Sequence, residues 1–289
     1  FVAGRSAGAR RAPTTMLRAL VLLAFSGAQA LYTPTGAVSR RRAIELAGGA
    51  AFPAAFSRQQ PASATEEMMK VYFGAGCFWH VQHEFVGEEV AALNRGPSTI
   101  TAVTGYAGGD RLGPNDRVCY HNFQRFADYG SLGHAEVVQV EIPQSAFPRF
   151  CKKYFDLFGS RGYRHDPQDK GGEYRSVLGL AGGQNSPLFD VVRQAALESP
   201  GGMKLYPGRG DDPDTIGDKA VLVYDSVKYP FHAAELYHQF HNDFMGQPYG
   251  KAYNSLQGIQ YKEGKVGLTG CPDMDPVKDA GKFAVGFPS

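Results

Sequence analysis

Apolar and polar positions change period repeatedly from residue 66 onward, which predicts strands and helices in turn. The segment 68–73, MMKVYF, is a short apolar strand, and a glycine-containing turn leads into a helix that starts near Cys77. Trp79 lies about 100° around that helix from the first apolar residue, so we expect it outside the core-facing stripe. The stripe itself recurs at helical spacing: Phe78, Val81, Phe85, Val86 and Val90.

The same alternation continues toward the C-terminus. Further strands are expected at 98–109, 134–142, 174–180 and 219–225. Further helices are expected at 145–158, 186–197 and 231–244. Two long polar loops, 110–133 and 160–173, are expected to be functional. The pattern therefore predicts one two-layer α/β domain over 66–260, followed by a flexible tail with frequent glycine and proline, 261–289.

Composition supports a real core and separates the charge into two parts. Hydrophobic residues make up 43% of the 289 residues, which is ample for a packed interior. Residues 1–65 carry eight arginines and a single acid, so the remainder is mildly acidic although the net charge is +2. No basic surface is left to neutralise phosphates, and we do not expect nucleic-acid binding.

Residues 1–65 resemble two targeting signals in series. The first is an apolar run that ends in the triplet AQA at 28–30. The second has adjacent arginines at 40–42, a run of small residues, and the triplet ASA at 62–64. We expect removal of this leader and delivery to a plastid, with the thylakoid lumen as a candidate and secretion as the alternative. Neither apolar run reaches the roughly 18 residues of a spanning helix, so no membrane span is expected in the mature protein.

Cys77 allows three interpretations. At a helix N-terminus the backbone amides and the macrodipole favour a thiolate, which predicts a lowered pKa and a nucleophile with Trp79 as an apolar wall. A buried core cysteine is the second interpretation. A metal site that includes His80 and His83 is the third, but the chain has no CxxC pair and these histidines would need ligands from elsewhere.

A second metal candidate is the segment HAAELYHQFH. Glu235 and His238 have the spacing of di-iron helices, but no second Glu-x-x-His occurs in the chain. Steps of three residues also drift around a helix, so four such side chains cannot share one face. We therefore interpret the segment as a polar helix face and expect no metal.

Five motifs in order carry a resemblance over residues 70–245: GCFW, TGYAGG, GHAEVVQV, DKGGEYRS and YPFHAAELYHQF. Together they resemble the A-type peptide methionine sulfoxide reductases. The resemblance implies an α+β fold, a two-layer α/β roll with a mixed sheet. It also implies thiol-dependent reduction of (S)-methionine sulfoxide, free or in proteins, through a cysteine sulfenic acid. No cofactor is implied, the reductant is a thioredoxin-like dithiol, and the protein is expected to be a monomer.

The resemblance assigns roles to particular residues. Cys77 is the nucleophile, and Phe78 and Trp79 form the slot for the S-methyl group. Glu136 matches the acid of the family. It lies in an apolar strand, where burial would raise its pKa and keep it protonated.

Asp169 and Tyr174 match the active-site Asp and Tyr, with Tyr174 donating to the sulfoxide oxygen and Asp169 supporting the pocket. The place of a second family tyrosine is taken by Asn115, in a stretch that is longer here. Tyr129 or Tyr120 can substitute, and Tyr129 is favoured because it lies on the glutamate side of the insertion.

The other cysteines and one histidine complete the candidate site. His80 replaces the family glycine after GCFW and adds a titratable group near the thiol. Cys271, in a glycine-rich tail expected to be mobile, is the candidate that resolves the sulfenic acid of Cys77 by forming a disulfide. Cys151 lies in a phenylalanine-rich stripe and is expected in the core. Cys119 is either a core residue or a loop thiol.

Two other functions remain open at this level. The longer loop and His80 could have removed turnover, which would leave a sulfoxide-binding protein without catalysis. The histidine-rich segments leave a metal-dependent redox protein as the less favoured possibility.

Overall fold

The computed structural model describes residues 66–272. The targeting leader predicted at 1–65 and the last part of the predicted tail, 273–289, lie outside the described residues.

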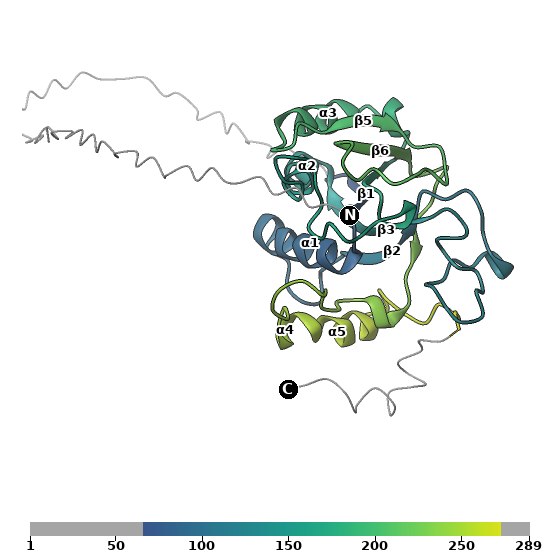
Figure 1. The fold of residues 1–289 in the computed structure, drawn as a ribbon. Coiled ribbons are helices and arrows are strands. Elements are labelled where there is room, and N and C mark those ends of the chain that lie inside the picture. The colour runs from purple at the N-terminus through teal and green to yellow at the C-terminus, as the bar shows by residue number, and fades with distance from the viewer. Residues whose placement is uncertain (1–65, 273–289) are drawn as a thin grey trace, which may run out of the picture. The chain divides into compact units, whose positions relative to one another are not determined.

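A seven-stranded sheet lies at the centre of the fold (Figure 1). Its strands are β1 (Met68–Gly74), β2 (Val103–Ala107), β3 (Ala135–Pro143), β4 (Val177–Leu180), β5 (Lys204–Pro207), β6 (Ala220–Asp225) and β7 (His232–Ala233). They are arranged in the order β5-β6-β4-β1-β3-β2-β7. Strand β6 pairs in parallel with β4 and β5, and all other pairs are antiparallel. The predicted mixed sheet is therefore confirmed.

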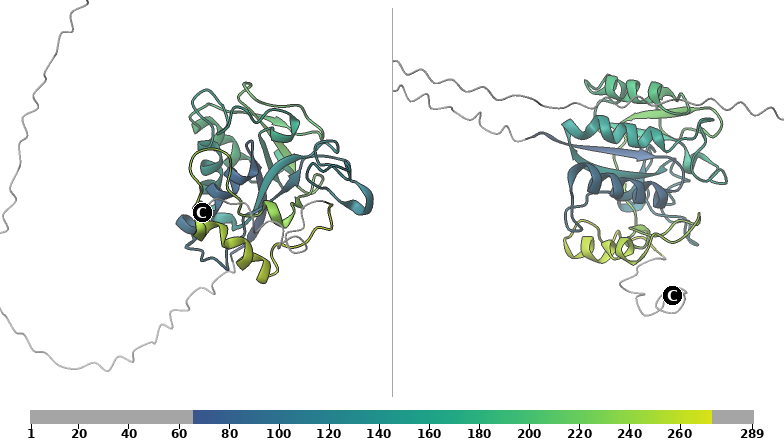
Figure 2. Two further views of the ribbon diagram at one scale, coloured as in Figure 1. Left: turned by 60° about the horizontal axis from the view of Figure 1, so that its bottom comes forward. Right: turned by 90° about the vertical axis from the view of Figure 1, so that its left-hand side faces the viewer.

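The main helices lie along one face of this sheet. They are α1 (Phe78–Leu93), α2 (Phe147–Asp156) and α3 (Phe189–Glu198), with the short α4 (Lys251–Asn254) and α5 (Leu256–Lys262) near the C-terminus. In the right-hand view of Figure 2 they lie side by side in front of the strands. Contacts of α1 with β1, β2 and β3, and of α2 with α1 and α3, complete the two predicted layers.

Alternation along the strands divides the core between the two faces of the sheet. In β1, Val71 and Phe73 pack with the helices, whereas Tyr72 belongs to a smaller cluster on the opposite face. The stripe predicted on α1 is buried except for Val90, which is half exposed. Trp79 corrects the helical-wheel prediction, because its ring is 5% exposed and packs in the same core as that stripe.

The helix predicted at 231–244 is wrong. This segment contains β7, a short 3-10 turn at Leu236–His238 and irregular chain, and Phe240 has a positive φ of 56°. The buried Gln239 side chain accepts from the amide of Thr104 and donates to its carbonyl oxygen. Hydrogen bonds with β2 thus replace the local bonds of a helix, so tertiary contacts override the local pattern.

The flexible tail was predicted to begin at residue 261, but the folded domain continues beyond that residue. Helices α4 and α5 extend to Lys262, and a disulfide between Cys271 and Cys119 links the following segment to the 110–133 loop. Buried Leu256 and the fully covered Gln260 anchor α5 on the domain. The domain therefore extends to at least residue 272.

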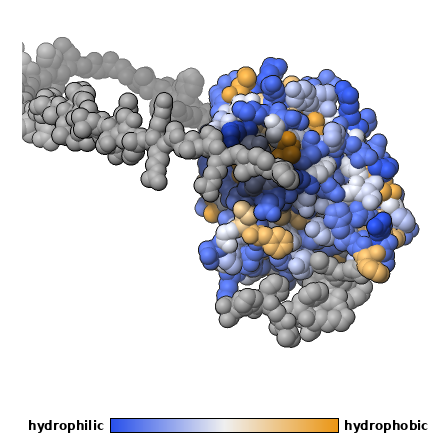
Figure 3. Space-filling view, in the orientation of Figure 1, coloured by the Kyte–Doolittle hydropathy of each residue, from blue (hydrophilic) through white to orange (hydrophobic). Residues whose placement is uncertain are grey.

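The surface on the side seen in Figure 3 is mainly hydrophilic, with separate small groups of apolar residues. Within residues 66–272, no helix is both long enough and apolar enough to cross a bilayer.

Candidate active site

Cys77 is placed by the turn between β1 and α1. Gly76 has a φ of 82°, and a Cβ there would lie 2.8 Å from Oδ2 of Asp169. The same oxygen accepts a hydrogen bond of 2.9 Å from the backbone amide of Cys77, which is the N-cap residue of α1. The glycine thus lets Asp169 approach closely, and Asp169 fixes the backbone of the nucleophile.

Glu136 lies on β3, next to the start of α1. Its Oε2 accepts a hydrogen bond of 2.9 Å from the amide of Phe78, and the Tyr129 hydroxyl donates to its Oε1 at 3.1 Å. Burial raises the pKa of Glu136 to about 8, although both hydrogen bonds pull in the opposite direction. The carboxyl group is therefore mainly protonated at neutral pH, as the sequence predicted.

The predicted lowering of the Cys77 pKa is wrong. Burial, followed by the charge of Glu136, raises the pKa of the thiol well above its usual value. The amides of Trp79 and His80 do favour the thiolate, as expected at a helix N-terminus, but desolvation outweighs them. Cys77 is consequently a thiol at neutral pH, and its attack must be coupled to loss of the proton.

An aromatic wall flanks the thiol. Phe78 and Trp79 both line the pocket, and their ring centroids are 6.3 Å apart. His238 packs against both rings from behind, and His241 lies 4.2 Å from the indole, measured between ring centroids. Burial lowers the pKa of His238 to about 3, so the ring that supports Phe78 and Trp79 is neutral.

The three tyrosines that the sequence analysis proposed lie near Glu136, whereas Asn115, at the expected place of the second family tyrosine, does not. Tyr120 and Tyr174 line the pocket with Cys77, whereas Tyr129 is fully buried behind Glu136. Asn115 lies in a short 3-10 turn and is absent from the lining. Of the two candidates for the second tyrosine, Tyr129 is hydrogen-bonded to the acid and Tyr120 lines the cavity.

Arg164 is a supporting residue that the sequence analysis missed. Its buried guanidinium donates to the carbonyl oxygens of Asp169 and Tyr174 and forms an ion pair of 2.9 Å with Asp214. These bonds hold both ends of the DKGGEYRS segment against the pocket. In the sequence Arg164 is only one arginine in a long polar loop, and such arginines are too common for its role to be predicted.

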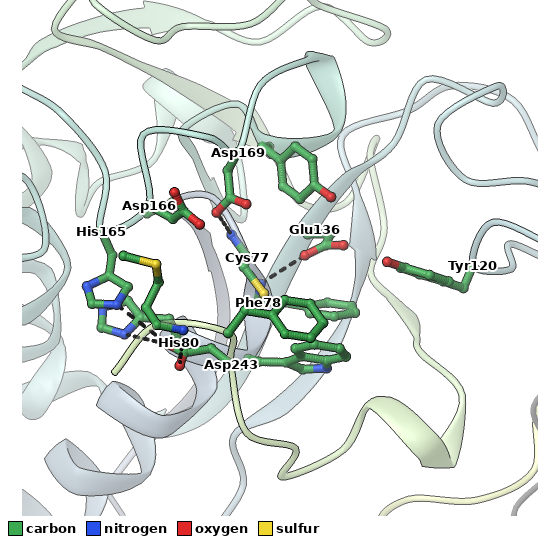
Figure 4. A pocket seen from close by; sticks show the side chains of 14 residues that line it. Cys77, Phe78, His80, Tyr120, Glu136, His165, Asp166, Asp169 and Asp243 are labelled. Atoms are coloured by element: carbon green, nitrogen blue, oxygen red, sulfur yellow. Dashed lines mark hydrogen bonds and ion pairs between the residues drawn. The ribbon is translucent and has the colours of Figure 1, made fainter. Parts of the chain in front are cut away.

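The pocket has a volume of about 90 Å³, and Figure 4 shows Cys77 between Asp169 and Glu136. Its wall also includes residues that the sequence analysis did not propose: Ala75, His165, Asp166, Asp243, Phe244 and Met245. Two of these, Asp243 and Phe244, come from the end of the segment that was predicted as a helix, and Met245 follows it directly. Because this segment was predicted as a helix, the sequence analysis did not place its last residues in the wall of the pocket.

The predicted metal candidates are separated by the fold. His83 stacks on Tyr249 and pairs with Glu84, away from the thiol. Glu235 accepts hydrogen bonds from the Tyr106 hydroxyl and the amide of Tyr120. His83 and Glu235 are therefore each paired with protein neighbours, whereas both ring nitrogens of buried His238 lack a hydrogen-bond partner.

His80 has different neighbours. Its ring stacks on that of His165 with 3.7 Å between centroids, and burial lowers its pKa to about 4. It is neutral at physiological pH and lies on the pocket wall.

Among the other cysteines, Cys151 lies as predicted and Cys271 does not. Cys151 is a buried free thiol in the core, as predicted. Cys271 is not a free, mobile thiol, because it is bonded to Cys119. Its proposed bond to Cys77 would first require that disulfide to open.

A thiol next to a protonated carboxylic acid, in a small cavity with an apolar wall, fits the class of thiol-dependent oxidoreductases. Comparison with known proteins narrows this class. Residues 69–198 match the family described as "Peptide methionine sulfoxide reductase". The peptide methionine sulfoxide reductase MsrA of Geobacter sulfurreducens is 32% identical over 132 residues, which cover 45% of this chain and 68% of the relative. The chain belongs to the peptide methionine sulfoxide reductase family.

Further relatives cover more of the chain. The enzyme of the same name from Ruthia magnifica is 27% identical over 63% of this chain and 91% of its own length. Among solved structures, methionine sulfoxide reductase A of Corynebacterium diphtheriae is 18% identical, with a TM-score of 0.37, over 71% of this chain and 78% of its own. Reduced Mxr1 from Saccharomyces cerevisiae is 20% identical, also with a TM-score of 0.37, over 60% of this chain and 82% of its own.

Proposed function

We propose that this protein reduces (S)-methionine sulfoxide to methionine, with Cys77 as nucleophile and Glu136 as general acid. The observation that carries the proposal is the position of Glu136. It is a buried acid that is mainly protonated at neutral pH, and it is hydrogen-bonded to the residue next to Cys77.

The chemistry follows from the protonation states. A sulfoxide sulfur becomes electrophilic when its oxygen accepts a proton or strong hydrogen bonds. Glu136 supplies the proton, while Tyr120 and Tyr174, which line the cavity, are placed to donate hydrogen bonds to the same oxygen. The sulfur of Cys77 attacks, and the carboxylate left on Glu136 takes up the thiol proton.

The electrons balance over this half-reaction. The sulfoxide loses its oxygen and becomes methionine, and Cys77 gains that oxygen as a sulfenic acid. One thiol of a dithiol reductant then forms a disulfide with Cys77 and releases water. The second thiol of the reductant breaks that disulfide and restores Cys77.

Phe78 and Trp79 support selectivity for the S-methyl group, because both are pocket residues and offer apolar rings beside the thiol. Asp169 positions the amide of Cys77, and its own pKa is raised by burial. None of these steps calls for a cofactor, and a thioredoxin-like protein is the proposed reductant.

The deciding experiment is turnover of dabsylated methionine sulfoxide with dithiothreitol, with each epimer assayed separately. Turnover of the S epimer alone supports the proposal. Binding of the S epimer without turnover would favour the alternative of a sulfoxide-binding protein.

We also propose delivery to a plastid, with the thylakoid lumen as the favoured compartment, and a monomeric mature protein. The support for delivery is the pair of arginine-led apolar runs in residues 1–65, each followed by a small-x-small triplet. The support for a monomer is the mainly hydrophilic surface on the side seen in Figure 3.

A further inference from the structure

One side of the pocket is formed by two histidines and an aspartate from three separate parts of the chain. His80 is the third residue of α1, His165 belongs to the loop 160–171, and Asp243 follows β7 in the irregular segment. Figure 4 shows the two imidazole rings stacked beside the Asp243 carboxylate. The side chain of Asp243 is only 5% exposed, and that of His80 is 14% exposed.

The distances in this group suit ligands of a cation better than hydrogen bonds. Nδ1 of His80 lies 3.7 Å and Nε2 of His165 lies 3.5 Å from the same oxygen, Oδ2 of Asp243. A direct N–H···O bond would measure about 2.7–3.2 Å. Two ligand atoms about 2.0–2.1 Å from a tetrahedral zinc ion are roughly 3.3–3.4 Å apart. One ligand atom from each side chain falls within 4.8 Å of the others.

The carboxylate of Asp243 is held in place by its surroundings. The Tyr249 hydroxyl donates to Oδ2 at 2.5 Å, and the amide of Met245 donates to Oδ1 at 3.0 Å. Such bonds to a carboxylate are the outer contacts that orient metal ligands in proteins. The aspartate is therefore fixed. The rings of His80 and His165 are stacked 8° from parallel, so exposed His165 must turn before both imidazole nitrogens point at one ion.

We propose that His80, His165 and Asp243 form a binding site for a divalent transition metal of the Zn²⁺ type at the side of the pocket. Two imidazoles and one carboxylate are a donor set that suits Zn²⁺ and its neighbours better than Mg²⁺ or Ca²⁺, which prefer oxygen ligands alone. Three protein ligands leave the fourth position to water, as in open zinc sites.

A bound ion would affect the reaction, and this step rests on the proposed function of Cys77. The three ligands line the same 90 Å³ cavity as the thiol. An ion with its water would occupy part of this cavity and would fix the 160–171 loop and the 243–245 segment to α1. Metal occupancy therefore lowers reductase activity by restricting entry of the sulfoxide.

Binding is tested with the full chain carrying Cys77→Ser, without reductant. In that protein Cys151 is buried and the other two cysteines are paired, so no accessible thiol competes for the ion. Calorimetric titration with Zn²⁺ should give one equivalent bound, and Co²⁺ should give the visible bands of a nitrogen- and oxygen-ligated ion without a thiolate charge-transfer band. Adding His165→Gln should weaken binding at least about tenfold.

His83→Gln is the matched control, because His83 is another α1 histidine with a carboxylate neighbour and lies outside the cluster. It should leave Zn²⁺ affinity unchanged. Absence of stoichiometric binding, or equal affinity in the His165→Gln variant, would overturn the site.

Inhibition is tested in the protein with Cys77 intact, as one turnover without added reductant, so that no dithiol chelates the ion. One equivalent of Zn²⁺ should suppress methionine formation, and His165→Gln should relieve that suppression relative to its own metal-free rate. Equal suppression in both proteins would show that the ion acts elsewhere and would overturn the inhibitory role. Failure of the metal-free protein to form methionine would count against the proposed function, while the binding result in the Cys77→Ser protein would stand.

Discussion

The amide of Phe78 donates a 2.9 Å hydrogen bond to Oε2 of Glu136 and so joins the first residue of α1 to the second residue of β3. This bond brings the acid to the residue beside Cys77. It also leaves Oε1 to Tyr129, so that both oxygens of the buried carboxyl group have partners. The N-terminus of α1 thus positions both the proton donor Glu136 and the nucleophile Cys77.

Substitution of Cys77 by Ser should abolish turnover of the S epimer. A thiol takes up the sulfoxide oxygen by becoming a sulfenic acid, and a hydroxyl cannot do so. Epimer-resolved assays of the variant measure this loss. Cys151→Ala is the matched control, since Cys151 is the other free cysteine and is buried in the core. Turnover that survives in Cys77→Ser would remove Cys77 from the nucleophile role.

Glu136→Gln should lower kcat by roughly 10²–10⁴-fold with a much smaller change in KM, because general acid catalysis acts in the transition state. The pH profile gives a second readout. The pKa of Glu136 is raised to about 8, so its protonated form is present below that pH and is lost as the pH rises through it.

We therefore expect kcat/KM of the unmodified protein to fall above about pH 8 and this limb to vanish in Glu136→Gln. Because the pKa of Cys77 lies well above its usual value, thiol ionisation contributes only at still higher pH. A profile that is the same in both proteins would exclude Glu136 as the acid.

Tyr129→Phe and Tyr120→Phe should have different effects. The Tyr129 hydroxyl donates to Glu136 and lowers its pKa, so its removal should move the alkaline limb of kcat/KM to higher pH. Tyr120 lines the cavity without a hydrogen bond to the acid, so its removal should reduce the rate and leave the limb in place. If Tyr120→Phe moves the limb and Tyr129→Phe does not, the two assignments are reversed.

The disulfide between Cys119 and Cys271 should stabilise the domain, because it closes a loop with a sequence separation of 152. Cys271→Ser should lower the free energy of unfolding by about 2–5 kcal/mol in the absence of reductant. Urea denaturation of both proteins measures the difference. With dithiothreitol present, the two proteins should unfold at nearly the same urea concentration, and a difference that persists would point to a cause other than the disulfide.

The leader, which lies outside the described residues, predicts a mature N-terminus directly after Ala64. Mass spectrometry of the protein isolated from its native cells should find Thr65 as the first residue. Native protein that retains residues 31–64 would indicate a single cleavage and would contradict delivery to the thylakoid lumen.

The sequence by itself determined the elements whose local pattern and tertiary environment agree. The strands of the sheet centre follow from their apolar runs, since both of their faces are buried, and the helix after Cys77 follows from its hydrophobic period, since it buries one face. Ordered motifs placed Cys77, Glu136, Asp169 and Tyr174 in one site, and all four line the same pocket. Burial of Glu136 also followed from the apolar residues around it in β3.

Only the tertiary structure decided the features that depend on distant residues. The segment 231–244 has a helical pattern, but Gln239 bonds to β2 and the helix does not form. The pKa of Cys77 is raised because desolvation, a property of the assembled pocket, outweighs the local amides of α1. The pairing of Cys271 with Cys119 and the convergence of His165 with Asp243 join residues far apart in the chain. Local patterns report on neighbours in sequence, and these features arise from neighbours in space.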